Sequence, residues 1–455
     1  MVFDGKIKRG EEDLISSLPD VILQEILCFI PTKLAITTSL LSKRWRHVWC
    51  EIPSFSIDAD IYKREEPVWC TPSNNKTLNR YTAPRIMNFN LNISSQQNIP
   101  YRDKWIEFAM SRNVENLSLD FSKACSDENY KLPDFFYISS SLKQLTLEVD
   151  FCDMMIPIPL VSWTSLMTLS LRWCAFSDKS MAKILSGCPI LESLTLYSCN
   201  KLMVLDLSKS MRLRTLQVKR HVAVSGPMEI LAPYIRLLRL ESSQLPCTFV
   251  DVSSLREAKL DICFIASNPN LKADILQITV LKMLDKLHNV EKLTLGENFL
   301  QILSLAELRG VTFPMLKIKA LTLETKIFQY VIPGIERLLQ NSPDIENLTL
   351  LPMNRNTIPG GLLDKYLKSQ CLNIDECWRS KDGVFWNKSY WNVESNHVIS
   401  LVELMLKNTM ALAKIVLLLD ERYLQFKVKD LVPRLSHYNN VAIALLKQTN
   451  THEEW

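Results

Sequence analysis

The chain has 455 residues, of which 47% are hydrophobic, and a formal net charge of +4 at pH 7. This length accommodates about three ordinary domains, or one extended repeat array with a small domain, and the small, interspersed charge excess does not call for a nucleic-acid partner. The twelve cysteines show no paired or metal-ligand spacing, and no apolar run approaches the ~18 residues of a membrane-spanning helix. We therefore expect no cofactor, no metal site and no membrane span, in a reduced compartment such as the cytoplasm and/or the nucleus.

The first 54 residues predict a tail followed by a small helical module. Residues 1–13 are mostly charged or polar and indicate a flexible N-terminal tail, whereas residues 14–54 are dense in helix signals. Pro19 suits the first turn of a helix, because its missing N–H has no helical acceptor there. From Ile22 the apolar residues follow a period of 3.6 residues, and Pro31 ends the pattern. The pattern predicts one amphipathic helix from Pro19 to the residues before Pro31.

Two more short helices are predicted in the same module. Thr32 is expected to cap a second helix and Ser42 a third, and the third carries Trp45 and Trp49 four residues apart on one face. Helices this short bury too little apolar surface to be comfortably stable alone. We therefore expect part of the apolar stripe to face a partner molecule, while Val48 and Trp49 pack inward.

These residues carry a family resemblance. The words "LPDVILQEILCFIPTK" and "TSLLSKRWRHVW" resemble an F-box: a Leu-Pro pair, an Ile/Leu-rich helix, a second proline and a Ser-Lys-x-Trp-Arg ending. Leu41 stands where many members have Val. The resemblance implies binding to the Skp adaptor of a cullin-RING ubiquitin ligase; the alternative is a three-helix core that serves only the rest of this chain. By position, the adaptor-binding residues are Leu18, Pro19, Ile22, Ile26, Leu27, Pro31, Leu40 and Trp45.

A repeated phrase follows a stretch, residues 55–100, that we interpret as a linker leading into a solenoid. The phrase L-x-x-L-x-L, with Val or Ile allowed and Ala in one copy, occurs ten times between Val114 and Ile345, mostly at steps in the twenties. This period is typical of leucine-rich repeats, in which each strand must stack on its neighbours to bury its leucines. Residues 101–355 are therefore predicted to form an irregular leucine-rich-repeat solenoid.

The repeat pattern also predicts helices and a binding face. The segments "SDKSMAKILSGCP" and "PGIERLLQNSP" are amphipathic and end in Gly or Asn followed by Pro, which indicates return helices between strands. Side chains alternate across a strand, so the residues between and just after the leucines should line the concave face. The candidate target-binding residues there are Arg172, Tyr197, Lys219, Arg239, Glu241, Lys259, Asp261 and Glu324. Their mixed charge favours a protein or peptide partner over a phosphate backbone.

The C-terminal residues 356–450 interrupt and then resume the repeat pattern. The Trp-rich stretch "CWRSKDGVFWNKSYWNVE" is expected to pack as a cap over the solenoid end, with a binding surface as the alternative. A predicted helix then places Leu406 six residues before Leu412 in a new strand phrase. The words "LKNTMALAKIVL" and "LVPRLSHYNNVAI" resemble the FBD region of plant-type F-box/leucine-rich-repeat proteins, although Leu435 interrupts the expected serine run. Residues 451–455 are a tail.

Together these features predict an α/β fold: an N-terminal three-helix F-box, then an irregular leucine-rich-repeat solenoid with parallel strands on the concave face and helices and loops outside, then an FBD-like C-terminal cap. The resemblance implies a non-catalytic substrate-recognition subunit of an SCF-type ubiquitin ligase. Its expected partners are a Skp-type adaptor, the cullin and RING subunits reached through it, and an unknown protein target, with no nucleic acid and no membrane. Three alternatives stay open: a non-degradative scaffold, an enzyme hidden in the C-terminal third, and a co-receptor whose face a small molecule completes.

Overall fold

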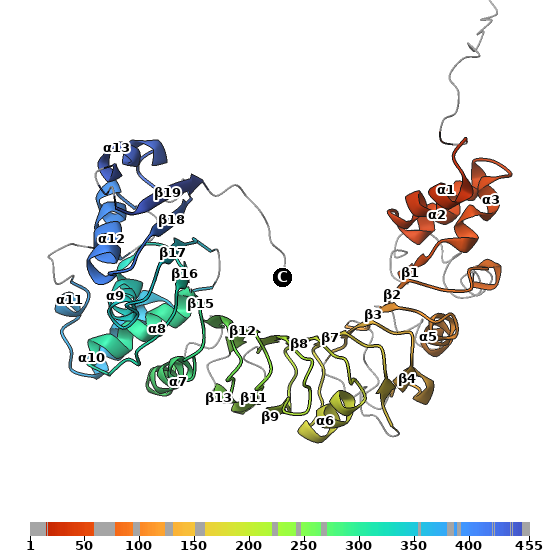
Figure 1. Ribbon diagram of the computed structural model, residues 1–455, viewed down its shortest axis with the longest axis horizontal. Helices are drawn as coiled ribbons and strands as arrows, with labels where there is room; N and C mark the ends of the chain where they lie inside the picture. Colours follow the sequence, from red (N-terminus) through yellow and green to blue (C-terminus); the bar gives the residue numbers. More distant parts are fainter. Residues whose placement is uncertain are drawn as a thin grey trace, which may run out of the picture. The chain divides into compact units, whose positions relative to one another are not determined.

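The computed structural model describes residues 15, 17–58, 78–93, 101–122, 131–150, 160–220, 226–242, 247–264, 271–353, 356–379, 386–388, 393–420, 422, 424–436, 438 and 440–447. The chain forms two compact units, Met1–Leu166 and Met167–Trp455. Unit 1 contains the N-terminal helices and the first strands, and unit 2 contains the remaining strands with the larger helices (Figure 1).

The N-terminal helices of unit 1 match the prediction. They are α1 (Asp20–Cys28), α2 (Thr32–Thr37) and α3 (Trp45–Val48), with 3-10 turns η1 (Thr38–Leu40) and η2 (Trp49–Glu51). Figure 1 shows α1, α2 and α3 grouped at one end of the unit. The expected cap at Thr32 is wrong, because α2 begins at Thr32 itself, after Pro31. The Ser42 hydroxyl does accept a long hydrogen bond, 3.5 Å, from the Trp45 N–H at the start of α3.

A parallel sheet follows within unit 1. Its order is β1 (Ser54–Asp58), β2 (Asn88–Asn92), β3 (Asn116–Asp120) and β5 (Gln144–Glu148), and a second pair joins β4 (Ile138–Ser139) to β6 (Ser162–Trp163). Helix α5 (Arg102–Ser111) and the turn η4 (Asp134–Tyr137) connect these strands. Alternate side chains of β1 and β2 are buried, and the Phe55 and Phe89 rings stack with centroids 6.2 Å apart. The sheet therefore starts earlier in the chain than the leucine phrases do.

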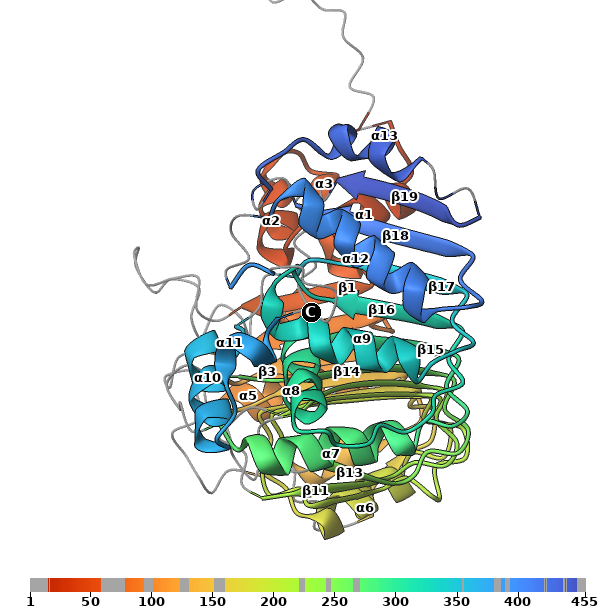
Figure 2. The same cartoon turned by 90° about the vertical axis from the view of Figure 1, so that its left-hand side faces the viewer.

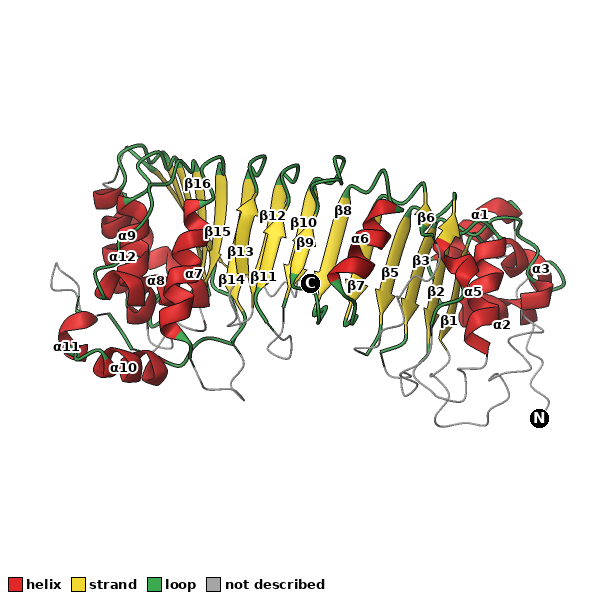
Figure 3. Cartoon of the chain, turned by 90° about the horizontal axis from the view of Figure 1, so that it is seen from below, coloured by secondary structure: helices red, strands yellow, loops and turns green. Residues whose placement is uncertain are grey.

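In the described part of unit 2, ten parallel strands form one sheet. Each pairs with the next in chain order, and the strands lie side by side in Figure 3. They are β7 (Thr168–Arg172), β8 (Ser193–Tyr197), β10 (Thr215–Lys219), β12 (Leu237–Ser242), β14 (Glu257–Ile262), β15 (Lys292–Gly296), β16 (Ala320–Glu324), β17 (Asn347–Leu350), β18 (Lys414–Leu419) and β19 (Ala442–Lys447).

The leucines of these strands project from one face of the sheet, which we call the inner face. Return segments cover this face. Some return segments contain the short strands β9 (Val204–Asp206), β11 (Met228–Leu231) and β13 (Cys247–Asp251), which form a second parallel sheet. Other return segments contain helices. In Figure 2, α9 and α12 lie beside one another across the same side of the strands. The helices are α6 (Asp178–Ser186), α7 (Ala273–Asp285), α8 (Glu297–Leu308), α9 (Ile332–Gln340), α10 (Gly360–Ser369), α11 (Ile374–Cys377), α12 (Ser395–Asn408) and α13 (Val432–Leu435), with turns η5 (Gln329–Val331) and η7 (Val428–Leu431).

The ten predicted leucine phrases all form strands. Each strand begins two residues after the start of its phrase, as β8 at Ser193 does after Leu191. The paired leucines are buried: Leu194 is 0% and Leu196 is 2% exposed, while the residues between them face the other side. The predicted α/β fold, a helical module followed by a leucine-rich-repeat solenoid of parallel strands, is confirmed.

The Trp-rich stretch is packed where the structure describes it. Trp378 and Trp386 are each 6% exposed. The Trp378 indole N–H donates to Asp364 at 2.8 Å, and its ring meets Tyr330 edge-on at 4.9 Å between centroids. Trp391 lies outside the described residues.

Candidate functional site: the helical module and the open face of the repeat sheet

The helical module has a small core of its own. Leu23 and Ala35 are fully buried, and Leu27 is 2% exposed between the three helices. Trp45 and Trp49, from the turn and helix that close the module, are 6% and 1% exposed. Val48 and Trp49 were predicted to pack inward, and both are buried.

The rest of the apolar surface of the module is uncovered. Phe29 is 88% and Leu40 is 86% exposed, although both are large hydrophobic side chains. Burying such a side chain is worth ~1.5–3 kcal/mol, so this surface has a strong tendency to be covered by another molecule. The exposed hydrophobic residues of the module are Ile15, Val21, Ile22, Ile26, Phe29, Leu34, Leu40 and Leu41.

The anchors assigned from the F-box resemblance fall into two groups. Pro19, Ile22, Ile26, Pro31 and Leu40 are exposed, and Leu18 is half-buried. Leu27 and Trp45 are buried in the core of the module, where they hold the helices together, and their part in adaptor binding stays a prediction. The physical reason is that a stripe of apolar residues on a helix has two edges, and the packing against α2 and α3 covers only one of them.

Sequence reasoning missed part of this surface. Val21, Phe29 and Leu34 extend the exposed stripe, with exposed fractions of 65%, 88% and 51%. The signal was present, because Phe29 and Ile30 precede Pro31 at the end of a helix that is too short to bury both. The side that faces outward depends on the crossing of the helices, which the pattern does not state.

An arginine fastens the first residues of the module. The Arg44 guanidinium donates to the Leu18 carbonyl and to Asp20 Oδ1, with Nε 2.9 Å from that carboxylate oxygen. Arg44 and Asp20 are 24 residues apart and about half exposed. This contact holds the Leu18–Pro19 segment against the start of α3.

The module is also joined to the first strand of unit 1. The Thr32 hydroxyl accepts a hydrogen bond from the Ser56 N–H at 2.7 Å and lies 3.1 Å from the Ser56 hydroxyl. Gln24 donates to Glu51 at 3.2 Å. The side chain expected to cap a helix therefore connects α2 to β1 instead.

The predicted target-binding residues share one face in unit 2. We call this the open face of the sheet, the side opposite the buried leucines. Arg172, Tyr197, Lys219, Glu241 and Asp261 stand side by side in register on five neighbouring strands. Arg239 and Lys259 are paired in the adjacent row, and Glu324 lies on β16 opposite Gly296.

Seven of these eight residues line a single pocket of about 100 Å³; Glu324 is the exception. Thr195 and Gln217, which the sequence analysis did not single out, line it too, because they occupy the same row as Arg239. Glu324 reaches the pocket through Lys259, whose Nζ is 2.7 Å from Glu324 Oε1. The sequence pattern thus found the face and most of the pocket residues.

The Tyr197 ring forms an aromatic wall of the pocket, and Trp173, which is not part of the lining, packs against it. The Trp173 and Tyr197 rings meet edge-on with centroids 5.2 Å apart, and Lys219 Nζ lies 5.5 Å from the centre of the Tyr197 ring. Burial raises the pKa of the Tyr197 phenol above its ordinary value. Tyr197 therefore stays neutral at physiological pH and contributes an apolar face and a hydroxyl.

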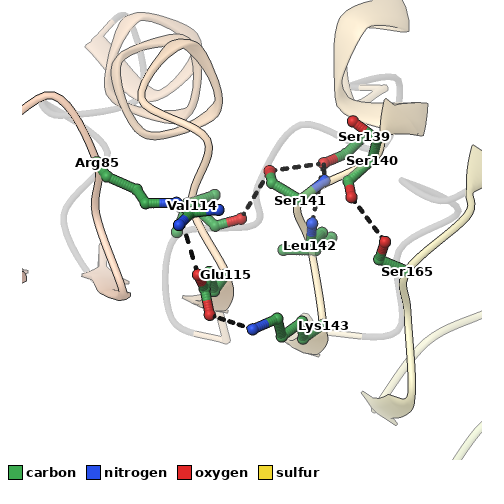
Figure 4. Close-up of polar contacts among 9 residues, drawn as sticks. All are labelled: Arg85, Val114, Glu115, Ser139, Ser140, Ser141, Leu142, Lys143 and Ser165. Atoms are coloured by element: carbon green, nitrogen blue, oxygen red, sulfur yellow. Dashed lines mark hydrogen bonds and ion pairs between the residues drawn. The ribbon is translucent and has the colours of Figure 1, made fainter.

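A hollow in unit 1 is lined by several serines. It measures about 490 Å³ and contains Ser139, Ser140 and Ser141. Figure 4 shows a structural role for two of these hydroxyls: Ser139 Oγ accepts from the Leu142 N–H at 3.2 Å, and Ser141 Oγ donates to the Val114 carbonyl at 3.1 Å. They hold the turn before β5.

Beside that turn, one carboxylate forms ion pairs with two basic side chains. In Figure 4, Glu115 lies between Lys143, 2.6 Å away, and Arg85, 3.6 Å away. The hydrogen bond from Lys143 holds the pKa of Glu115 below its ordinary value. These residues precede neighbouring strands and fasten successive repeats to one another.

Other chemistry has no visible site in the described part of the chain. His397, the histidine of the C-terminal third on a helix, serves as a cap: its Nδ1 accepts from the Glu394 N–H at 3.1 Å, and its ring stacks on Trp386. Among the described residues, no group of three His, Cys, Asp or Glu side chains could hold a metal ion. No helix in these residues is both long enough and apolar enough to cross a bilayer.

Comparison with known proteins decides the family. The F-box domain model matches residues 15–56, and the model described as At1g61320/AtMIF1, LRR domain, matches residues 78–412. The chain belongs to the F-box/LRR-repeat proteins. It is similar to three Arabidopsis thaliana members of this family: At3g18150 is 59% identical over 97% of this chain and 93% of the relative. At3g03360 is 50% identical over 95% and 90%, and At5g02910 is 47% identical over 95% and 94%.

The match of the repeat model extends to residue 412, beyond the last of the ten phrases, and β18 and β19 continue the same parallel sheet after it.

Proposed function

We propose that this F-box/LRR-repeat protein is a substrate-recognition subunit of an SCF-type cullin-RING ubiquitin ligase. The helical module binds a Skp-type adaptor, which connects it to the cullin and RING subunits, and the open face of the repeats binds a protein target. The chain itself performs no catalysis; it raises the concentration of the target near the ubiquitin-charged enzyme.

The uncovered apolar surface of the helical module is the observation that carries this proposal. Ile22 and Ile26 are 44% and 43% exposed and lie one helical turn apart on α1, and Leu40 is 86% exposed on η1. A module whose own core is complete and which still exposes eight large hydrophobic side chains is suited to a permanent partner.

Co-purification with a recombinant Skp-type adaptor tests the proposal. We expect the triple variant Ile22→Ala, Ile26→Ala, Leu40→Ala to bind the adaptor at least about tenfold more weakly. Each truncated side chain buries less apolar surface against the adaptor, which costs ~1 kcal/mol or more of binding free energy. The matched control carries Ile275→Ala, Ile278→Ala and Met410→Ala, three exposed apolar residues of unit 2, and should bind normally. Equal adaptor binding by both variants contradicts the proposal.

A reconstituted ubiquitination assay separates the ligase from a scaffold. Transfer of ubiquitin to a bound target, dependent on Ile22, Ile26 and Leu40, supports the ligase. Adaptor binding without any transfer favours the scaffold alternative.

Two finer assignments belong to the same proposal. Residues 356–450 form an FBD-like region, supported by the words "LKNTMALAKIVL" and "LVPRLSHYNNVAI", while α12 and β18, with Leu406 six residues before Leu412, continue the helix-strand repeats. The protein acts in the cytoplasm and/or the nucleus, which a fluorescent fusion with the full chain would test.

A further inference from the structure

The charges of the open-face pocket are partly sorted by depth: two acids lie deepest, with Lys259 beside them. Four basic and two acidic side chains line it: Arg172, Lys219, Arg239 and Lys259 against Glu241 and Asp261. The sorting shows in the exposures of these side chains and of the neighbouring Glu324.

The deepest acids are occupied by the chain itself. Asp261 is 5% exposed, and its Oδ1 accepts from the Ile262 N–H at 2.8 Å. Its carboxylate fills the space over Gly296, where an added Cβ would lie 1.9 Å from Asp261 Cγ. Glu324, with a side chain 7% exposed, accepts from Lys259 at 2.7 Å. A basic ligand would have to break this buried pair to reach Glu324, which is costly.

Three of the four bases lie further out than these two acids, whereas Lys259, with a side chain 17% exposed, belongs to the buried pair. Arg239 is exposed in the middle of β12, and Arg172 is half-buried at the end of β7. Lys219 is 31% exposed, more than its partner Glu241, which is 22% exposed and 3.0 Å away. An approaching group therefore meets guanidinium and ammonium groups first, with the Tyr197 ring beside them.

We propose that this pocket binds an acidic segment of the target protein, with an Asp or Glu side chain placed at Arg239 and an apolar or aromatic neighbour against Tyr197. Arginine binds carboxylates with two parallel hydrogen bonds, and a positive rim over an aromatic wall also speeds the encounter with an acidic chain. This inference rests on the proposed function, because it names the class of target that the open face recognises.

Three peptide pools test the inference on the full-length chain. All are twelve-residue peptides with a central Tyr in a random Gly/Ser/Ala background, and they carry three Glu, three Gln or three Lys. Fluorescence anisotropy should show the Glu pool binding about tenfold more tightly than the Gln pool, and the Lys pool most weakly. Arg239→Glu should remove the preference for Glu, whereas Arg239→Lys should retain most of it. Residue 239 is exposed and lies beside Lys259, so the glutamate variant is expected to fold.

Controls and contrary outcomes are specific. Lys282→Glu makes a change of the same sign at an exposed position of α7 and should leave the preference intact. Equal binding of the three pools by the unmodified chain, or an unchanged Glu preference in Arg239→Glu, overturns the inference. So does tripolyphosphate that binds more tightly than the Glu pool in an Arg239-dependent manner, since the pocket would then be a site for a small polyanion.

The two proposals fail separately. The Ile22/Ile26/Leu40 variant should keep the Glu preference while it loses the adaptor. If the unmodified chain shows no preference for the Glu peptides, the prediction of adaptor binding is unaffected.

Discussion

Helices α1 and α8 are similar in apolar content and opposite in their surroundings. α1, in the helical module, buries Leu23 and Leu27 among its nine residues and exposes Val21, Ile22 and Ile26. α8, in unit 2, buries ten of its twelve residues, because α7, α9 and the strands β14 and β15 pack around it. An apolar helix sequence therefore does not indicate whether the helix is covered by its own chain or by a partner.

The burial in α8 extends to polar groups. Asn298 is 3% exposed and donates to the Ile262 and Asn356 carbonyls at 2.8 and 3.0 Å, and Gln301 donates to Ile358 at 3.1 Å. These amide side chains are buried in the solenoid, and backbone carbonyls replace water as their hydrogen-bond acceptors. The helical module, in contrast, leaves large apolar side chains exposed to water.

The largest expected effect divides the module into core and surface. Trp45→Ala removes a 6% exposed indole and should destabilise the module by about 3–5 kcal/mol, because it leaves a cavity between the helices. Leu40→Ala, at an 86% exposed side chain, should change the stability by less than about 0.5 kcal/mol. Limited proteolysis and hydrogen exchange of residues 15–56 would measure both.

If Leu40→Ala opens the module as readily as Trp45→Ala does, the distinction between supporting and presenting residues is wrong.

The second effect concerns a carboxylate inside the solenoid. Glu297 is 5% exposed; its Oε2 accepts from the Lys326 N–H at 3.1 Å, and its Oε1 has no hydrogen-bond partner among the described residues. Burial raises the pKa of Glu297 from 4.5 to about 7. The folded state then holds a proton that the unfolded state releases, so the free energy of unfolding should fall as pH rises from about 5 to about 7 and level off above, by on the order of 2–3 kcal/mol.

Glu297→Gln tests this pH dependence, because the amide keeps an oxygen for Lys326 and Thr325 and cannot ionise. We expect the variant to be more stable than the unmodified chain at pH 8 and similar to it at pH 5, in denaturant titrations at the two pH values. The same slope with pH in both proteins would show that Glu297 does not titrate in this range.

The third and smallest effect probes how closely α8 and α9 approach. A Cβ on Gly334 would lie 2.7 Å from the Leu300 carbonyl oxygen and from the Ser304 nitrogen, both backbone atoms of α8. Gly334→Ala should therefore cost about 1–3 kcal/mol in a thermal unfolding measurement. Gly361→Ala, on α10, has nothing within 4 Å of the new methyl group and should be neutral or slightly stabilising. Similar melting temperatures for the two variants would mean that the helices can separate at little cost.

Much of the repeat region could be predicted because its signal is local. Strand alternation alone placed Tyr197 and Lys219 on the open face, since Leu196 and Val218 beside them must point into the core. Strands β1 and β2 could not be found this way. Their words "SFSID" and "NFNLN" carry Phe55 and Phe89 where the phrase has Leu, although Ile52 and Ile86 fill its first position.

The helical module shows the limit more sharply. The family pattern treats Ile26, Leu27 and Trp45 alike, as apolar anchors of one motif. The structure separates Ile26, 43% exposed, from Leu27, 2% exposed, although they are adjacent in sequence. Adjacent helical residues point about 100° apart, so a modest rotation of α1 decides which of them meets α2 and α3.

The sequence by itself determined the order of the modules, the strands of the repeats and the side of each strand on which a residue lies, because these follow from periods of two and 3.6 residues along the backbone. Only the tertiary structure decided which apolar side chains stay uncovered and which charges lie deep, since both depend on segments far away in the chain. Gly296 makes room for Asp261, 35 residues earlier, and Lys259 pairs with Glu324, 65 residues later. No local pattern carries that information, because burial is a property of neighbours in space.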